Sequence, residues 1–139
     1  MINFNIETDG FKLKDLRKKK NWLKELAKEE GFKIIELNYI FLSDEQLLEM
    51  NVSYLNHDTY TDIITFDNSE QEDKIEGDIF ISVERVAENA LKFNVSAETE
   101  LIRVLSHGLL HLCGYLDKKP ADVKIMREKE EYYLGKYLS

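Results

Sequence analysis

Hydrophobic and polar residues recur along the chain with two different periods, and these periods predict where strands and helices form. Residues 2–7 (INFNIE) alternate between apolar and polar with a period of two, as a half-buried strand does. Between residues 13 and 27 the apolar positions recur at helical spacing instead, and Gly31 follows as a stop. By the same criteria we expect further strands at 33–42, 62–66 and 77–82 and a helix at 44–55.

Serine and proline residues mark where the helices begin. Ser43, Ser82 and Ser96 can each accept a hydrogen bond from a backbone N–H of a first helical turn. The helix that begins after Ser82 is expected to end near Phe93. Pro120 suits the first turn of a last helix. Four apolar side chains of that helix are expected to face the core: Val123, Met126, Tyr133 and Leu134.

The order of these elements predicts the fold class. Strand and helix alternate twice, two strands follow, and three helices end the chain. We therefore expect an α/β (α+β) fold built as a single domain over residues 1–139, with one mixed four-stranded sheet and about five helices. Residues 62–66 and 77–82 flank a strongly acidic loop, and such a pair of short strands is expected to lie side by side.

The composition agrees with a globular protein that folds without covalent or metal cross-links. The chain has 139 residues, of which 43% are hydrophobic and 33% charged, and a chain of this length can bury a sizeable core. A metal site would therefore serve chemistry rather than folding. Cys113 is the single cysteine, the N-terminal residues have no secretion signal, and no apolar run approaches the roughly 20 residues of a membrane span. We expect a cytoplasmic protein that does not contact membranes.

Charge is distributed unevenly along the chain. The 27 acidic residues outnumber the 19 lysines and arginines, and a net charge of −8 argues against a protein that coats nucleic acid without specificity. Residues 12–33 nevertheless contain nine lysines or arginines and four acidic residues. This basic segment can contact a polyanion, although a charged helix face is more often simply solvated.

Two of the three histidines, His107 and His111, are four residues apart in a predicted helix. This spacing places both imidazoles on one helix face, as two ligands of one metal ion require, but a pair of hydrogen-bonded core histidines has the same spacing. The helix is apolar on nearly every side, so we expect it to be buried. Gly114 ends it, Asp117 follows six residues after His111, and this turn with a carboxylate favours the metal site.

The spacing is similar to that of the extended zinc peptidase motif, with one difference that argues against a peptidase of that kind. Gly108 stands where the motif has the glutamate that activates water.

Two other residues are weaker candidates for chemistry. His57 lies in a polar loop and is expected to be a surface histidine, and Cys113 is expected to be a small buried side chain without a further role.

The residues around the two histidines resemble those of the YbeY-type endoribonucleases. The family pattern His-Gly-x-Leu-His-Leu-x-Gly-Tyr-Asp-His is similar to residues 107–117 (HGLLHLCGYLD), where seven of its nine fixed positions match. The family segment Thr-Asp-Val-Leu-Ser-Phe resembles residues 61–66 (TDIITF), and Gly-Asp-Ile resembles residues 77–79. The order and spacing of the three segments agree, so the resemblance covers roughly residues 35–135.

Two departures from the family pattern change the expected site. Asp117 takes the place of the third metal-binding histidine, so the resemblance implies one metal ion held by His107, His111 and Asp117. Such a set suits Zn²⁺ best and also accepts Mn²⁺ or Fe²⁺, because the carboxylate lowers the net charge at the metal. Leu55 stands where the family has an arginine, and Arg103, one turn before His107, is our candidate for the missing charge.

The resemblance implies a metal-dependent hydrolase that cleaves phosphodiester bonds in single-stranded RNA, with His107 and His111 as catalytic residues. We add Arg103 as a catalytic residue in place of the missing family arginine. It further implies a role in ribosomal RNA maturation and ribosome quality control, in contact with a ribosomal subunit or ribosome-associated proteins. Two other functions fit the residues: a ribosome-assembly or RNA-binding factor whose metal is structural, and a small-molecule metallohydrolase. Asp62 and Asp78 are expected either to support the cavity or to cap turns.

Overall fold

The computed structural model describes residues 1–55 and 61–139, and within them the order of elements agrees with the predicted order. The strands are β1 (Ile2–Ile6), β2 (Lys33–Leu42), β3 (Ile63–Asp67) and β4 (Lys74–Ser82). The helices are α1 (Leu16–Glu29), α2 (Asp44–Leu55), α3 (Val83–Lys92), α4 (Ala97–Leu112) and α5 (Pro120–Leu138). Strand β4 begins earlier than predicted, because residues 74–76 already pair with β2.

The four strands form one mixed sheet in the order β1-β2-β4-β3. Strands β1 and β4 both run parallel to β2, and β3 runs antiparallel to β4. Helix α1 connects the parallel pair β1 and β2, as the geometry of parallel strands requires, and β3 and β4 are neighbours as predicted. The predicted α+β fold is therefore confirmed, with five helices in the described residues and one mixed four-stranded sheet.

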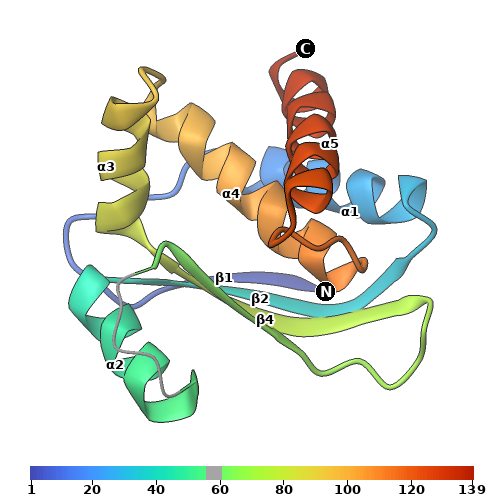
Figure 1. Ribbon diagram of the computed structural model, residues 1–139, viewed down its shortest axis with the longest axis horizontal. Coiled ribbons are helices and arrows are strands. Elements are labelled where there is room, and N and C mark those ends of the chain that lie inside the picture. The colour runs from blue at the N-terminus through green and yellow to red at the C-terminus, as the bar shows by residue number, and fades with distance from the viewer. Residues whose placement is uncertain (56–60) are drawn as a thin grey trace.

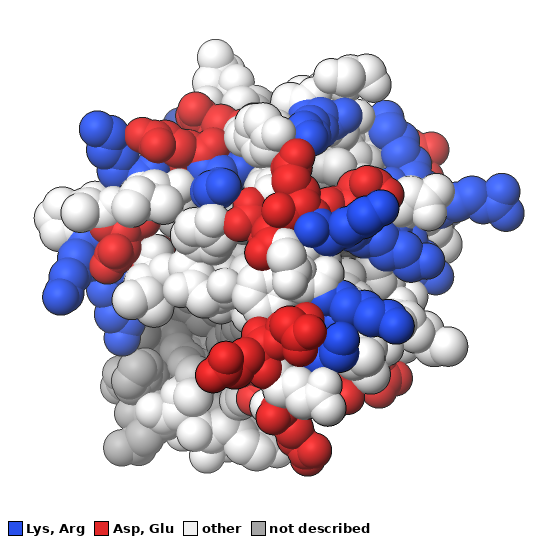
Figure 2. All heavy atoms as spheres, turned by 90° about the vertical axis from the view of Figure 1, so that its right-hand side faces the viewer, with Lys and Arg blue, Asp and Glu red and all other residues white. Residues whose placement is uncertain are grey.

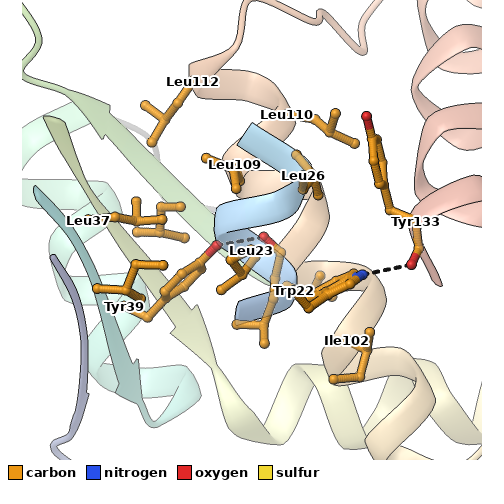
Figure 3. Packing of buried hydrophobic residues seen from close by; sticks show 14 of the residues in the cluster. Trp22, Leu23, Leu26, Leu37, Tyr39, Ile102, Leu109, Leu110, Leu112 and Tyr133 are labelled. Carbon is orange, nitrogen blue, oxygen red and sulfur yellow. Dashed lines mark hydrogen bonds between the residues drawn. The ribbon is translucent and has the colours of Figure 1, made fainter. Parts of the chain in front are cut away.

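The helices cover the two faces of the sheet unequally. Helices α1, α4 and α5 lie on one side of the sheet, and α2 lies on the other (Figure 1). The larger hydrophobic cluster joins β2 to these three helices. Two hydrogen bonds run through it (Figure 3): Trp22 Nε1 donates to the carbonyl oxygen of Tyr133 (2.8 Å), and the Tyr39 hydroxyl donates to the carbonyl oxygen of Leu105 (2.8 Å).

Helix α4 is deeply buried, as its sequence predicts. Ten of its sixteen residues are buried. A Cβ added at Gly108 would lie 2.8 Å from Ile79 Cδ1 and 3.1 Å from Ile63 Cδ1, so this glycine allows the helix backbone to lie close against β3 and β4. Neither α4 nor any other helix in the described part of the chain is both long and apolar enough to cross a membrane.

The predicted helix starts are confirmed. Ser82 Oγ accepts a hydrogen bond from the backbone N–H of Arg85 (3.1 Å) at the start of α3. Ser96 Oγ accepts one from the backbone N–H of Thr99 (3.0 Å) at the start of α4, and Pro120 is the first residue of α5. Each cap satisfies a donor that the first helical turn leaves without an intrahelical acceptor.

One residue of α5 is placed differently from the prediction. Met126 and Tyr133 are buried and Leu134 is partly buried, as predicted, but Val123 is 42% exposed. Val123 lies in the first turn of α5, where it borders a small cavity of about 140 Å³ next to α4 instead of packing into the core. The buried stripe of α5 contains Glu130 as well as the apolar residues.

The basic segment is solvated along most of its length, with one exception. Lys18 and Lys24 are exposed, whereas Lys19 is fully buried and donates hydrogen bonds to the carbonyl oxygen of Lys14 (2.5 Å) and to Glu98 Oε2 (2.9 Å). The charge of Lys19 therefore joins α1 to α4 and is not available to an RNA backbone. On the face shown in Figure 2, lysines and arginines are interspersed with acidic side chains and form no continuous basic surface.

Glu30, directly after α1, joins this helix to the C-terminal part of the chain. Its carboxylate accepts hydrogen bonds from the Tyr115 hydroxyl (2.7 Å), from Lys129 Nζ (3.2 Å) and from the Tyr133 hydroxyl. Burial by itself would raise the pKa of Glu30, but these donors outweigh it and hold the pKa below the ordinary value of 4.5. Folding therefore favours the ionised form of Glu30.

Replacing Glu30 by Gln should lower the free energy of unfolding by about 1–2 kcal/mol at pH 7, because an amide cannot accept from all three donors. A carboxylate whose pKa is lowered by folding stabilises the fold above its unfolded pKa, and this contribution is lost as the pH falls through the folded pKa. The difference between wild type and variant should thus shrink below the ordinary pKa of 4.5. Urea unfolding at about pH 7 and about pH 3 measures both effects.

The exposed neighbour Glu29 provides the control for this experiment. Glu29 also binds α5, through Lys136 Nζ (2.8 Å), but at the solvent-exposed surface, where such pairs contribute little. Glu29→Gln should therefore change the stability far less than Glu30→Gln. Equal losses for the two variants at pH 7 would contradict the role assigned to Glu30.

Candidate metal centre

The structure brings the three predicted metal ligands together. His107 and His111 lie one turn apart on α4, with ring centroids 4.7 Å apart. Gly114 follows the helix with a φ of 103°, and its N–H donates to the carbonyl oxygen of His111 (3.0 Å), a left-handed turn that reverses the chain. The reversed segment returns Asp117 to α4, where Asp117 Oδ2 lies 3.2 Å from Nε2 of both histidines.

The donor atoms fit a divalent metal ion in type and spacing. They all lie within 4.8 Å of one another. With zinc bonds of about 2.0–2.1 Å, two ligands of a tetrahedral site are about 3.3 Å apart. Each histidine Nε2 lies 3.2 Å from the Asp117 oxygen, which is close to that value. Three protein ligands leave a fourth position open, as in catalytic zinc sites, and the same donors suit Mn²⁺ or Fe²⁺.

The second ring nitrogen of His107 also has a partner. Its Nδ1 is hydrogen-bonded to Glu130 of α5, which is 1% exposed. Burial by itself would raise the pKa of Glu130, but the hydrogen bond with His107 and the charge of Arg103 outweigh it and lower the pKa. Glu130 was not predicted from the sequence. Its one signal in the sequence is a position four residues after Met126, on the buried stripe of α5.

Arg103 extends toward the same site, but its guanidinium is held by carboxylates. It donates to both oxygens of Glu100 (2.9 and 2.6 Å) and to Glu130 Oε1 (2.8 Å). Burial would lower the pKa of Arg103, and the two carboxylates more than compensate and raise it. These contacts do not test its expected role at the phosphate, which stays a prediction.

A cleft of about 690 Å³ opens beside the histidines. Leu55 at the end of α2, Asp62 just before β3 and Lys118 next to Asp117 all line it. Asp62 therefore lines the cavity, and its supporting role stays a prediction. Asp78 instead accepts a hydrogen bond from Asn38 Nδ2 (2.9 Å) on the sheet and is not among the described residues that line the cleft.

Comparison with known proteins agrees with the geometry of the site. A family model described as Endoribonuclease YbeY matches residues 2–138. The chain belongs to the YbeY endoribonuclease family. The Endoribonuclease YbeY of Cytophaga hutchinsonii is 53% identical over 134 residues, which are 96% of this chain and 94% of that protein. The Endoribonuclease YbeY of Flavobacterium johnsoniae is 54% identical over 131 residues, 94% of this chain and 93% of that protein.

A solved structure shares the fold as well. The solution structure of a protein from Thermotoga maritima is similar with a TM-score of 0.72 at 35% sequence identity, and the match covers 99% of this chain and 89% of that one. The resemblance to the YbeY family inferred from residues 107–117 is thus confirmed over nearly the whole chain.

The YbeY fold explains why a peptidase-like glutamate is absent. Gly108, at the position of that glutamate, lies against β3 and β4, so a carboxylate there would collide with the sheet.

Cys113 directly follows α4. Burial raises the pKa of its thiol to about 12, and the charge of Glu30 adds a smaller effect in the same direction. The thiol therefore stays protonated, in agreement with the expected inert role. His57 lies outside the described residues.

Gly108→Ala should destabilise the protein, because the added methyl group would overpack against Ile79 and Ile63. Overpacking costs about 1–3 kcal/mol, which exceeds the gain of about 1 kcal/mol from replacing glycine by alanine in a helix. Gly135→Ala in α5 is the matched control, since no atom lies within 4 Å of its added Cβ, and this variant should be slightly stabilised. Denaturant unfolding measures both, and equal stabilities would disprove the close packing at Gly108.

Proposed function

We propose that the chain is a metal-dependent endoribonuclease that hydrolyses phosphodiester bonds of single-stranded RNA in the cleft beside α4. The observation that carries the proposal is the convergence of His107, His111 and Asp117 at the wall of this cleft. Membership of the YbeY family supports the reaction class, because the relatives are endoribonucleases by name.

Each ligand has a definite task in this proposal. His107, His111 and Asp117 would hold one metal ion, Zn²⁺ in the first place and Mn²⁺ or Fe²⁺ as alternatives. Such an ion polarises a phosphoryl oxygen and lowers the pKa of a water that it binds. The two histidines bind as neutral imidazoles. Asp117 binds as an anion and so reduces by one the positive charge that the site offers to the phosphate.

The protein must also supply positive charge for the phosphate. Two cations line the described part of the cleft, Arg103 and Lys118. Arg103 remains the candidate from the sequence, but its guanidinium is already paired with the two carboxylates of Glu100 and Glu130. Lys118 is exposed and has no carboxylate among its described contacts. We therefore add Lys118, the neighbour of Asp117, as a side chain that contacts the phosphate.

We further propose ribosomal RNA as the substrate, in ribosomal RNA maturation and ribosome quality control. A ribosomal subunit or its associated proteins would present the single-stranded segment, and the cytoplasm would be the location. Exposed lysines of α1, such as Lys18 and Lys24, are available to the RNA backbone. The net charge of −8 favours binding to a defined segment over general coating of nucleic acid.

A second candidate function is that of an RNA-binding or ribosome-assembly factor whose metal is structural. Leu55 favours it, because this apolar side chain lines the cleft at the position of the family arginine. The loss of a cation that stabilises the transition state reduces catalysis more than binding. Hydrolysis of simple phosphodiesters or amides, without binding or cleavage of RNA, would instead indicate the third alternative function, a small-molecule metallohydrolase.

Elemental analysis of purified protein should find about one metal ion per chain in the wild type and much less in Asp117→Ala, because that variant removes one of three ligands. Circular dichroism should show that both are folded, since Asp117 lies at the surface of the cleft. Asp73→Ala, in an exposed loop, is the control and should retain the metal. A folded wild type that contains no metal and gains none on reconstitution would rule out the proposed site.

Removing the metal with a chelator should abolish cleavage of a single-stranded RNA and leave the circular dichroism spectrum unchanged. The core of the protein forms without the ligands, which lie at its edge. Restoring Zn²⁺ or Mn²⁺ should restore cleavage. If the chelated protein loses its secondary structure, or the metal-loaded protein never cleaves RNA, the structural-metal function is the better one.

Lys118→Ala should lower kcat/KM for RNA cleavage roughly tenfold, which corresponds to about 1.4 kcal/mol of transition-state stabilisation. Metal content should not change, because Lys118 is not a ligand. Lys119→Ala is the matched control: Lys119 is exposed, its side chain makes no capping bond to α5, and it does not line the cleft. Equal kinetics of the two variants would remove Lys118 from the mechanism.

A further inference from the structure

Glu130 is a carboxylate in an otherwise apolar position. It is 1% exposed and lies between Met126 and Tyr133 on the buried stripe of α5. Packing alone would favour a hydrophobic residue here, because a buried carboxylate is unfavourable unless it is paired and hydrogen-bonded. The contacts of Glu130 must therefore explain why the charge is there.

The hydrogen bonds of Glu130 go to one cation and one candidate metal ligand, and Arg127 of α5, which is 50% exposed, adds an ion pair at 4.0 Å. Glu130 Oε1 accepts a hydrogen bond from Arg103 (2.8 Å), and Oε2 is hydrogen-bonded to Nδ1 of His107. Arg103 also donates to both oxygens of Glu100 (2.9 and 2.6 Å), which is 2% exposed. The paired bonds fix the plane of the guanidinium, and the guanidinium in turn fixes the Glu130 carboxylate with one oxygen toward the imidazole.

This arrangement determines the tautomer of His107. An ionised carboxylate can only accept hydrogen bonds, so Glu130 favours a hydrogen on Nδ1 of His107 and Asp117 favours one on Nε2. Glu130 is buried and is the closer partner, whereas Asp117 is 36% exposed, so we expect Nδ1 to carry the hydrogen and Nε2 of the neutral ring to keep its lone pair. Nε2 is the atom 3.2 Å from Asp117 Oδ2. His111 has no carboxylate at its other ring nitrogen among the described residues. Of these two ligands, His107 is thus the one whose tautomer is set by a buried partner.

We propose that Glu130, held by Arg103 and Glu100, is a positioning residue that fixes the tautomer and orientation of His107 so that Nε2 faces the metal. The inference rests on the proposed function for the identity of the ligand that His107 binds. The tautomer itself is a property of the metal-free protein and can be tested separately. Glu130 acts through His107 and touches no substrate.

The first experiment measures the imidazole tautomers of the metal-free wild type by ¹⁵N NMR at about pH 9, where histidine is ordinarily neutral. Single His→Gln variants assign the signals of the three histidines. We expect His107 to carry its hydrogen on Nδ1. A His107 ring with its hydrogen on Nε2 would overturn the proposal. The tautomer is measured in the wild type, and the variants serve only to assign its signals.

The second experiment compares Zn²⁺ affinities by competition with a chromogenic chelator. Glu130→Gln should bind Zn²⁺ about 10- to 100-fold more weakly, because the amide can present its NH₂ group to His107 and favour the wrong tautomer. Glu131→Gln, the exposed neighbour on α5, should stay within about twofold of the wild type. Glu100→Gln, one step further from His107, should show a smaller loss. A folded Glu130→Gln with wild-type affinity would disprove the inference.

The role of Arg103 is decided by Arg103→Lys, which keeps the charge but loses the paired bonds to Glu100. Weaker Zn²⁺ binding supports the positioning role. Slower RNA cleavage with wild-type Zn²⁺ affinity assigns Arg103 to the phosphate and removes it from the proposal. A wild type that binds Zn²⁺ with the expected tautomer but never cleaves RNA would refute the proposed function and leave the positioning role of Glu130 intact.

Discussion

The site depends on one constraint: the helix that packs most closely on the sheet also carries a row of polar side chains. Glu100, Arg103, His107 and His111 follow one another at spacings of three and four residues, so they lie on one face of α4. Glu100 is fully inside and the others are partly buried. Because buried polar groups must be hydrogen-bonded, this face requires partners from elsewhere in the chain. Glu130 of α5 and Asp117 of the following loop supply them.

The apolar side of α4 determines where this polar face points. Gly108 lets the helix backbone approach Ile79 and Ile63 so closely that the rotation of the helix about its axis is fixed. With the rotation fixed, His107 and His111 line the cleft. The close packing of the core is thus also what preorganises the candidate metal ligands, and binding a metal would require little rearrangement of α4.

The distribution of charge separates two tasks within the same small region. In the buried group of Arg103, Glu100 and Glu130 the arginine is already paired with two carboxylates, which suits the holding of a histidine and leaves little positive charge for a phosphate. Positive charge at the surface of the cleft comes instead from Lys118 and from the metal that the ligands would hold. A protein with a net charge of −8 can in this way present a local site for a phosphodiester without binding polyanions everywhere.

The sequence by itself determined the order of strands and helices, the helix starts at Ser82, Ser96 and Pro120, and the grouping of His107, His111 and Asp117. These features follow from local hydrogen bonds and from the spacing of residues along one helix and its closing turn, which a sequence displays directly. The tertiary structure decided which distant groups pair with the buried charges. Glu130 meets His107 because α5 packs on α4, Lys19 is buried because α1 packs on Glu98, and Val123 is exposed because it lies beside a cavity. No local pattern contains these pairings, because they depend on how whole helices dock against one another.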